Sequence, residues 1–356
     1  MVLVDAAAAV PCSRAGRRAG PGGSIAIPSR RRLGRLAAAA GLGAAAGLAS
    51  AQPLAWPDRT VRAIVPFGPG GAPDILARIM ARHFPAQARG QQLIVENRSG
   101  AGGTIGAAYV AQSRPDGLTL LMAEQGAGAL AHELYQDLPY DPRRSFTPVI
   151  WLVDLPMVLV VRPGLAARDV AAVLEQARRQ PGSLSYASVG IGHMGHLAME
   201  LLQRRAGGGA QMLHVIYRSG GDIMAALVKG EVDMTVASYS SAQAFLQSGA
   251  LRPIAVTTAA PLAELPGVPL LSETVPGLTA SLWYGLLGPA GMSRQLVAEA
   301  NAVLNAVLAA PELRGTVRQQ QASDPIGGTA DRFAEHLRGE VERWTPVVRA
   351  AGGRLQ

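Results

Sequence analysis

The scarcest informative residue in this sequence is cysteine, which occurs once in 356 residues, as Cys12. Residues 1–51 are predicted to be removed as a leader. The mature chain then has no disulfide, no thiolate nucleophile and no cysteine ligand for a metal. Histidine offers no substitute, because H-E-x-x-H is absent and the pair His193 and His196 has no indicated third ligand. We therefore expect neither a metal nor a cofactor.

Lysine is the second scarcity, since Lys229 is the only one. Residues 1–51 hold seven arginines and one aspartate, which leaves 26 basic and 24 acidic residues after them. The net charge of +8 therefore belongs largely to the leader, and it gives no support for nucleic-acid binding, which needs a basic stripe on the folded domain. No later run is long and apolar enough to span a bilayer.

The N-terminus has the pattern of a secretory signal peptide. A basic segment at 29–35 precedes an uncharged Ala/Gly/Leu run at 36–48, and Ala-Ser-Ala follows at 49–51. We expect cleavage near Ala51 and an exported mature chain that begins at Gln52. Ser-Arg-Arg-x-Leu also fits a twin-arginine signal loosely, so both export routes stay open. Residues 1–28 match neither a leader nor a domain, and an overlong start assignment would account for them.

Beyond the leader, strand-like apolar runs alternate with segments of helical spacing. Strands are predicted at 61–66, 92–96, 118–123, 157–162, 184–188, 212–217, 232–237, 252–257 and 283–288. Helices are predicted at 73–86, 103–113, 168–179, 194–206, 221–229, 241–248, 293–309 and 330–350. The alternation indicates α/β architecture with mainly parallel sheets flanked by helices, and the length favours two domains. Pro139, Pro142 and Pro148 surround an expected loop after the first α/β unit, near an expected domain crossing.

The segment 61–74 is a candidate anion seat. A strand-like run leads into Gly70 and Gly71, and Pro73 and Asp74 suit the first turn of a helix. Glycines leave the backbone N–H groups of the loop and helix start accessible to an anion. A tight turn that binds nothing is the alternative.

Residues 190–195 read G-x-G-x-x-G between a predicted strand and a predicted helix, the context of a dinucleotide site. The next strand ends in Tyr217 and Arg218 rather than the acid that NAD requires. We expect a second glycine-rich anion loop instead, with His193 placed to face a ligand. A third loop, 97–106, is open to a structural or a cleft role.

The sequence gives little support for Ser188 as a catalytic nucleophile. Tyr186 takes the place of the first glycine of a nucleophile elbow, and no acid and histidine partners can be assigned.

Several short motifs occur along the chain in an order that is typical of one family. They are V-P-F…G-G…D…A-R at 65–78, V-E-N-R…G-A-G-G…G at 95–106, P-D-G-x-T-L at 115–120, L-P-Y-D-P…F-T-P-V at 138–149, Y-A-S…G…G…H-L at 186–197, H-V…Y at 214–217, G-E-V-D at 230–233, L-P-G-V-P at 265–269 and W-Y-G-L at 283–286. This succession resembles the Bug-type periplasmic solute-binding proteins, which are receptors of tripartite tricarboxylate transporters. It covers essentially the whole mature chain.

The resemblance implies a two-lobed, hinged α/β receptor: 1–51 extension and signal peptide, 52–156 and 281–356 first lobe, 157–280 second lobe. A small carboxylate would lie between the lobes, held mainly by backbone N–H groups and water. The implied ligand-binding residues are Phe67, Gly70, Gly71 and Asp74 on one side, and Ser188, Gly190, Gly192 and His193 on the other. Asp74 is expected to order its loop rather than touch the ligand, and His196 to brace the second loop.

The implied function is a periplasmic, monomeric, non-enzymatic receptor that delivers its ligand to membrane transporter subunits. Its rivals are a receptor of the same fold that feeds a sensor kinase, and an exported enzyme that uses Ser188 or His193. The chain departs from the family pattern at His193, Ile216 and Arg218, and at Glu124. If Glu124 faces the cleft, it would favour a ligand that also carries an amine.

Overall fold

The computed structural model describes residues 56–207 and 209–350. The predicted signal peptide and the cleavage near Ala51 lie outside the described residues. Within them, one nine-stranded sheet has the order β2-β1-β3-β9-β4-β7-β5-β6, with β8 beside β4. The strands are β1 (Val61–Val65), β2 (Leu93–Asn97), β3 (Thr119–Ala123), β4 (Phe146–Val161), β5 (Ser185–Ser188), β6 (Leu213–Ile216), β7 (Met234–Ser238), β8 (Arg252–Val256) and β9 (Ser281–Pro289).

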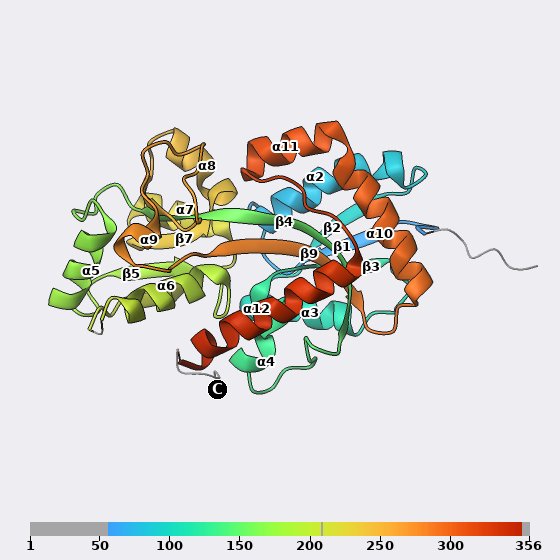
Figure 1. Cartoon of the computed structure of the whole chain (residues 1–356), viewed down its shortest axis with the longest axis horizontal. Helices are drawn as coiled ribbons and strands as arrows, with labels where there is room; N and C mark the ends of the chain where they lie inside the picture. The colour runs from blue at the N-terminus through green and yellow to red at the C-terminus, as the bar shows by residue number, and fades with distance from the viewer. Residues whose placement is uncertain (1–55, 208, 351–356) are drawn as a thin grey trace, which may run out of the picture. The chain divides into compact units, whose positions relative to one another are not determined.

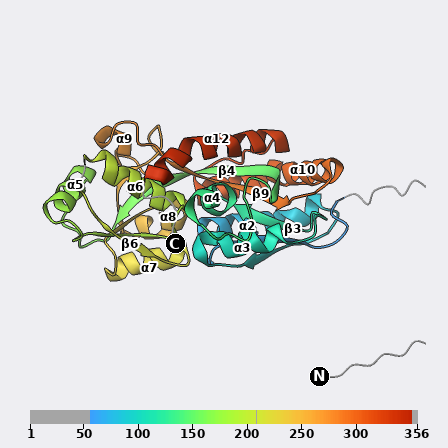
Figure 2. The same cartoon turned by 90° about the horizontal axis from the view of Figure 1, so that it is seen from below.

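Helices lie between and around these strands (Figures 1 and 2). The α-helices are α2 (Ala72–Gln87), α3 (Thr104–Ala111), α4 (Ala131–Leu134), α5 (Val170–Arg179), α6 (Met194–Arg205), α7 (Gly220–Lys229), α8 (Tyr239–Gln247), α9 (Leu271–Thr274), α10 (Arg294–Ala309), α11 (Pro311–Gln321) and α12 (Ala330–Ala350). A 3-10 turn, η1 (Ala101–Gly103), precedes α3, and a π-helical turn, η2 (Gly126–Leu130), precedes α4. The longest of these helices, α12, packs along β4.

The sheet has two halves joined by its two long strands (Figure 1). Residues 146–156 of β4 pair with β9, next to β3, β1 and β2. Residues 157–161 of β4 pair instead with β7 and β8, and β5 and β6 follow. We call these the first and second half-sheets. Chain connections between them run along β4 and β9, at positions 156–157 and 280–281.

The predicted α/β architecture is confirmed, with one addition. The pairs β1–β2, β1–β3, β5–β6 and β5–β7 are parallel, as the alternation predicts. The central strands β4 and β9 are antiparallel to each other and to their neighbours, which the sequence did not indicate. Parallel neighbours require a crossover connection, usually a helix. Antiparallel neighbours such as β4 and β9 do not, so the alternation of strands and helices gives no sign of them.

Alternate side chains of β4 pack on opposite faces. Val158 and Val160 belong to a smaller core under α7 and α8, whereas Met157, Leu159 and Val161 belong to the large core. A strand with period-two side chains that is buried on both faces reads as a continuous apolar run. The sequence therefore predicts a strand at 157–162.

The structure contains elements that the sequence did not indicate, among them residues 146–156 of β4, the short helices α4 and α9, and helix α11. The expected loop lies between α4 and β4, and Pro148 follows it inside β4, where the register with β9 shifts between Pro148 and Ile150. Proline is tolerated at such a bulge because no ladder N–H is required there. Helix α11 was missed because Pro311 at its first turn and Gly315 inside it resemble loop signals.

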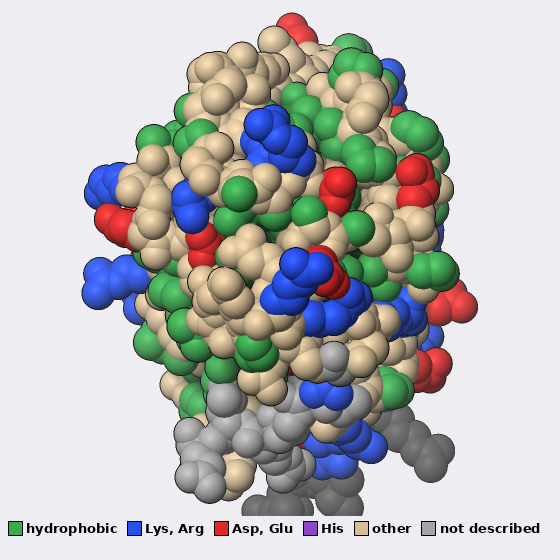
Figure 3. All heavy atoms as spheres, turned by 90° about the vertical axis from the view of Figure 1, so that its left-hand side faces the viewer, with side chains coloured by type: hydrophobic (Ala, Val, Ile, Leu, Met, Phe, Trp, Pro, Cys, Tyr) green, Lys and Arg blue, Asp and Glu red, His purple; other side chains and the backbone are tan. Residues whose placement is uncertain are grey.

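In the described part of the chain no single helix is long and apolar enough to cross a membrane, although α10 and α11, bent by 72°, reach that length together. The same residues contain no cluster of three or more potential metal ligands. On the face shown in Figure 3, basic side chains are interspersed with acidic and hydrophobic ones rather than aligned in a stripe.

Candidate ligand-binding cavity

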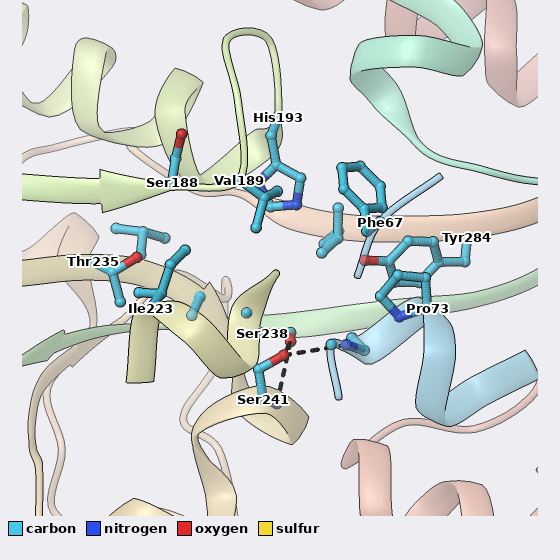
Figure 4. A pocket seen from close by; sticks show the side chains of 16 residues that line it. Phe67, Pro73, Ser188, Val189, His193, Ile223, Thr235, Ser238, Ser241 and Tyr284 are labelled. Atoms are coloured by element: carbon cyan, nitrogen blue, oxygen red, sulfur yellow. Dashed lines mark hydrogen bonds between the residues drawn. The ribbon is translucent and has the colours of Figure 1, made fainter. Parts of the chain in front are cut away.

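A small cavity lies between the two half-sheets (Figure 4). Its volume is about 30 Å³, enough for roughly one or two water molecules. One wall consists of Phe67, residues 71–73 and, from β9, Leu282 and Tyr284. The opposite wall belongs to the second half-sheet and consists of Ser188, Val189, His193, Gly220, Ile223, residues 235–238 and Ser241. A solute larger than water can enter only if these walls separate.

Four helices begin at the cavity, each just after a strand. Helix α2 follows β1, α6 follows β5, α7 follows β6 and α8 follows β7. Their N-cap residues are Gly71, His193, Ser219 and Ser238. The first N–H groups of a helix have no acceptor within it, and the helix dipole makes this end positive. Four helix starts around one cavity therefore form a site suited to an anion.

The lining contains no charged side chain among the described residues. Attraction for an anion must come from oriented backbone N–H groups and neutral side-chain donors. A desolvated site of this kind favours negative charge without an ion pair.

The Tyr284 hydroxyl is the clearest side-chain donor. The residue is 1% exposed, and its oxygen points into the cavity beside Phe67 (Figure 4). No hydrogen bond joins this hydroxyl to any residue in the described ranges. Burial raises the pKa of Tyr284 well above its ordinary value, so the phenol stays neutral. It is therefore available to donate to a ligand.

His193, in the second glycine-rich loop, lines the cavity and is a second neutral donor. Its Nδ1 accepts a hydrogen bond from the backbone N–H of Gly195 at 3.1 Å, which assigns the ring proton to Nε2. Burial, with a smaller contribution from His196, lowers the pKa of His193 to about 3. The imidazole meets the ring of Phe67 edge-on, with centroids 5.8 Å apart. His193 and Phe67 thus bring the two predicted loops together.

Gly71 lines the cavity, but Gly70 does not. The N–H of Gly70 donates to Asp74 Oδ2 at 3.1 Å, so it is not free for a ligand. Gly71 has a φ of −82°, which any residue can adopt. A Cβ at Gly71 would meet Gly220 N at 3.6 Å, across the cavity.

Asp74 orders the first loop, as expected, and does not line the cavity. Besides Gly70, its carboxylate accepts hydrogen bonds from Arg78 at 2.9 and 3.0 Å and from Asn97 at 3.0 Å. Burial tends to raise the pKa of Asp74, but the hydrogen bonds from Arg78, Gly70 and Asn97 outweigh it and lower the pKa. The carboxylate is therefore fully engaged by the first loop, by Arg78 of α2 and by Asn97 at the end of β2.

Ser188 lines the cavity but is engaged in its own loop. Its Oγ accepts from Gly190 N at 3.1 Å and lies 2.7 Å from His214 Nε2. Burial lowers the pKa of His214 to about 4. The sequence did not identify this serine–histidine contact, because 26 residues separate the two.

Gly190 and Gly192 lie beside the cavity rather than on it. A Cβ at Gly190 would approach Gly102 Cα to 2.5 Å, and a Cβ at Gly192 would overlap Leu134. These glycines permit the second loop to contact segments of the first half-sheet. His196 braces that loop, as predicted, since its Nδ1 accepts from Gly192 N at 3.3 Å.

The sequence reasoning missed the start of α8. Ser238 Oγ accepts from Ser241 N at 3.4 Å and donates to Ser241 Oγ at 3.0 Å. The signal was available, because a serine directly after a buried strand is a common N-cap. The helix was instead predicted to begin at 241.

Glu124 does not face the cavity. It is fully buried, and its carboxylate accepts hydrogen bonds from Gly126 N at 2.8 Å and Ala127 N at 3.0 Å. Burial raises the pKa of Glu124 from 4.5 to about 7, while these two hydrogen bonds act in the opposite direction. The condition under which Glu124 would favour an amine-bearing ligand is therefore not met.

The two half-sheets touch directly at and around the cavity. Gly68 N donates to the carbonyl of Arg218 at 3.0 Å, and Ala72 N donates to Ser241 Oγ at 3.2 Å. Gln243 Nε2 donates to the carbonyl of Gln319 at 3.1 Å. These contacts describe a closed arrangement of the two half-sheets.

Comparison with known proteins identifies the class. The model of the tripartite tricarboxylate transporter family receptor matches residues 76–352, and the chain belongs to this family. A UPF0065 protein from the tcbD-tcbE intergenic region of Pseudomonas sp. strain P51 is 36% identical over 330 residues, which cover 91% of this chain and 97% of that protein. Protein BugT of Bordetella pertussis is 32% identical over 303 residues, covering 85% and 92%.

Solved structures agree with the sequence relatives. Rpa4515 of R. palustris with adipate has a TM-score of 0.79 and 32% identity, over 84% of this chain and 100% of that one. MatC of Rhodopseudomonas palustris with bound malate has a TM-score of 0.77 and 29% identity, over 82% and 100%. The periplasmic binding protein BugD has a TM-score of 0.78 and 28% identity, over 84% and 100%. The chain therefore has the two-lobed fold of these binding proteins, and it is a solute receptor rather than an enzyme.

Proposed function

We propose that this protein captures a small carboxylate in the cavity between its two half-sheets and delivers it to a membrane transporter of the tripartite tricarboxylate type. The observation that carries the proposal is the convergence of four helix N-termini on a lining without charged side chains. The adipate and malate in the two solved relatives support a carboxylate as the ligand class.

In the proposed complex, one carboxylate lies among the starts of α2, α6, α7 and α8. Gly71 lets it approach the backbone, while His193 Nε2 and the Tyr284 hydroxyl donate to it from opposite walls. Ser188, Gly190 and Gly192 act indirectly by shaping the second loop. Phe67 contributes an apolar wall. Gly70 and Asp74 hold the first loop in place.

The two half-sheets correspond to the proposed lobes, 52–156 with 281–356 and 157–280. This division is supported by the change of partners along β4, from β9 before residue 157 to β7 and β8 from there on. Two strand connections leave the lobes free to hinge, and ligand would favour closure because it contacts both walls.

We further propose that the protein acts as a monomer in the periplasm after cleavage near Ala51. The basic segment, the apolar run and the small residues at 49–51 support export.

The proposed function is tested by native mass spectrometry of protein purified from the export compartment, followed by calorimetry with the ligand found. A retained carboxylate that binds without being converted is the expected result. Failure of a panel of mono-, di- and tricarboxylates to bind, with the protein shown to be folded and emptied of ligand, would contradict the proposal.

A further inference from the structure

A second pocket lies where β4 and β9 join the two half-sheets. Its volume is about 460 Å³, which is in the range of sites for small solutes. The first half-sheet and its helices contribute residues 154–156, Ser281, Ala322 and Arg343, and the second half contributes residues 257–262 and 279–280. We call this space the hinge pocket.

The hinge pocket and the ligand cavity lie on opposite faces of the joining strands. Leu282 of β9 lines the cavity, and side chains alternate along a strand, so Ser281 and Trp283 point to the other face. On that face Trp283 packs edge-on against Phe333 of α12, with ring centroids 5.7 Å apart. Asp154 of β4 is the cross-strand partner of Trp283 and shares its face. The hinge pocket is therefore a site separate from the cavity.

Asp154 is the only carboxylate in the lining of the hinge pocket, among the described residues. Its Oδ1 atom is buried and has no hydrogen-bond partner within the described ranges. Burial raises the pKa of Asp154 from 3.8 to about 6, although the hydrogen bond with Ser281 acts in the opposite direction. Near neutral pH the carboxylate is therefore mainly ionised. A buried, charged oxygen without a donor is unfavourable, and a solute that donates a hydrogen bond would relieve this.

The donors around Asp154 are engaged elsewhere. Arg343, the one cation in the lining, donates from Nη2 to the carbonyl of Thr279 at 3.2 Å, and its Nη1 lies 3.9 Å from Glu340. The hydroxyl of Thr257 donates to the carbonyl of Ala280 at 2.6 Å. The hydroxyl of Thr258 donates to the carbonyl of Ala260, also at 2.6 Å. Neither hydroxyl has a hydrogen left for a solute.

This chemistry favours an ammonium group as the occupant. An ammonium ion has three donors and no acceptor, so it supplies what Asp154 lacks and requires nothing from the engaged hydroxyls. Residues 259–262 are Ala, Ala, Pro and Leu, and they line the same pocket. They provide apolar surface for a short alkyl chain attached to the ammonium.

We propose that the hinge pocket binds a primary alkylammonium ion, whose N–H groups donate to the carboxylate of Asp154 while its alkyl chain lies against residues 259–262. This site is distinct from the cavity in place and in the charge of its ligand, and it does not depend on which solute the cavity holds. Because both half-sheets line the pocket in their closed arrangement, a bound ammonium ion stabilises that arrangement.

The test is calorimetric titration of the mature protein with n-butylammonium near neutral pH and at constant ionic strength. Phosphate is the buffer, because Tris is itself a primary amine. Tetramethylammonium and K⁺ are the comparison cations, since they carry the charge without N–H donors. Butylammonium should bind about tenfold or more tightly than either.

Asp154→Asn should weaken butylammonium binding by about tenfold or more, because it removes the charge and keeps the shape of the side chain. Asp331→Asn is the matched control, because Asp331 is an exposed aspartate on α12 outside the lining of the hinge pocket. Its affinity should equal that of wild type. Urea unfolding establishes that both variants are folded.

Three results would overturn the proposal: no binding of butylammonium to wild type, wild-type affinity in Asp154→Asn, or equal binding of tetramethylammonium or K⁺. Small-angle scattering of wild type provides a further check on the closed arrangement. Saturating butylammonium should leave the radius of gyration unchanged or make it smaller. An increase would show that the amine binds an open form and would contradict the assignment to this pocket.

Discussion

The backbone N–H of Ala72 donates a hydrogen bond to Ser241 Oγ at 3.2 Å, across 169 residues of sequence. Ala72 is in the first turn of α2 and Ser241 is in the first turn of α8. A hydroxyl from one wall thus satisfies a helix-start donor of the other wall. The same donor would serve a carboxylate, so this contact links closure of the cavity to ligand binding.

Ser241→Ala should loosen the closed arrangement without ligand. The lost hydrogen bond contributes roughly 1 kcal/mol, so the closed population should fall about fivefold relative to the open one. Small-angle scattering of the ligand-free protein should show a larger radius of gyration than wild type if wild type is mostly closed. Ser240→Ala is the matched control, because Ser240 is one residue away and its hydroxyl donates to Ser238, the N-cap of the same helix, rather than across to the first half-sheet.

A saturating ligand should return Ser241→Ala to the compact form, since it supplies contacts to both walls. A radius of gyration of Ser241→Ala that stays at the larger value with saturating ligand would contradict hinging as the basis of binding.

Gly71→Asp should abolish ligand binding while leaving the fold intact. Its carboxylate would extend toward Gly220 N and occupy the anion position with like charge, whereas the φ of Gly71 imposes no strain on a side chain. Ligand at a hundred times its Kd stabilises the native state by about 2.7 kcal/mol, which raises the Tm by roughly 5–10 °C at this size. That rise should be lost in the variant.

Gly71→Ala is the control for bulk alone. It should weaken binding less than Gly71→Asp, because a methyl group there makes ordinary contacts at 3.6 Å. Circular dichroism establishes that each variant is folded. Wild-type affinity in a folded Gly71→Asp would remove the first loop from the site.

Asp74→Ala should lower stability by roughly 2–3 kcal/mol, because Gly70 N, Arg78 and Asn97 lose a shared acceptor. The pKa of Asp74 is lowered in the folded protein, so its contribution is present above the ordinary value of 3.8 and is lost as the pH falls. Urea unfolding at neutral pH and near pH 3 should show a smaller difference between variant and wild type in acid.

Asp169→Ala is the control for Asp74→Ala, because it also removes a carboxylate from the start of a helix, but in α5, away from the cavity. Asp169 accepts from Ala172 N at 2.8 Å, and its loss should cost about 1 kcal/mol without changing ligand affinity. Asp74→Ala should weaken binding as well, since the first loop loses its support. Equal affinity in both variants would mean that Asp74 does not organise the site.

Glu124 should make the protein less stable as the pH rises. Its pKa is about 7 in the folded protein and 4.5 as the reference value, so the folded state binds more protons between these values and the free energy of unfolding falls there. At pH 8 the loss amounts to at most about 3 kcal/mol relative to pH 4. Glu124→Gln keeps an acceptor for Gly126 and Ala127 but cannot ionise.

Chemical unfolding from pH 5 to pH 8 checks this expectation as a difference between Glu124→Gln and wild type. The difference removes the opposing contributions of the buried histidines, which are common to both proteins. A variant whose stability relative to wild type does not rise with pH would show that Glu124 does not titrate in this range.

If the protein is exported and its signal peptide is cleaved after Ala51, the mature chain should begin at Gln52. Direct sequencing of the protein from the export compartment should find Gln52 at or within a few residues of the start. A protein that retains the arginines at 29–35 would contradict signal-peptide cleavage at this place.

The family, the alternation of strands and helices, and both glycine-rich loops were predictable from the sequence, because apolar periodicity and turn residues act locally. The roles of Asp74 and His196 were also predictable in part, since Gly70 and Arg78 lie four residues from Asp74, and Gly192 lies four residues from His196. Local chemistry determined these features. The third partner of Asp74, Asn97, is 23 residues away.

Tertiary structure alone decided which groups meet across the cavity. Tyr284, Ser241 and Gly71 come from distant segments, and their proximity depends on β4 and β9 joining two half-sheets in antiparallel register. Gly70 and Gly71 look equivalent in sequence. The hydrogen bond from Gly70 N to Asp74 is local, but only the tertiary structure places Gly71 on the cavity wall, opposite Gly220. The sequence could not show whether Glu124 faces the ligand, because the burial of a side chain follows from tertiary packing. In the structure Glu124 is buried, and its carboxylate accepts hydrogen bonds from the first N–H groups of η2.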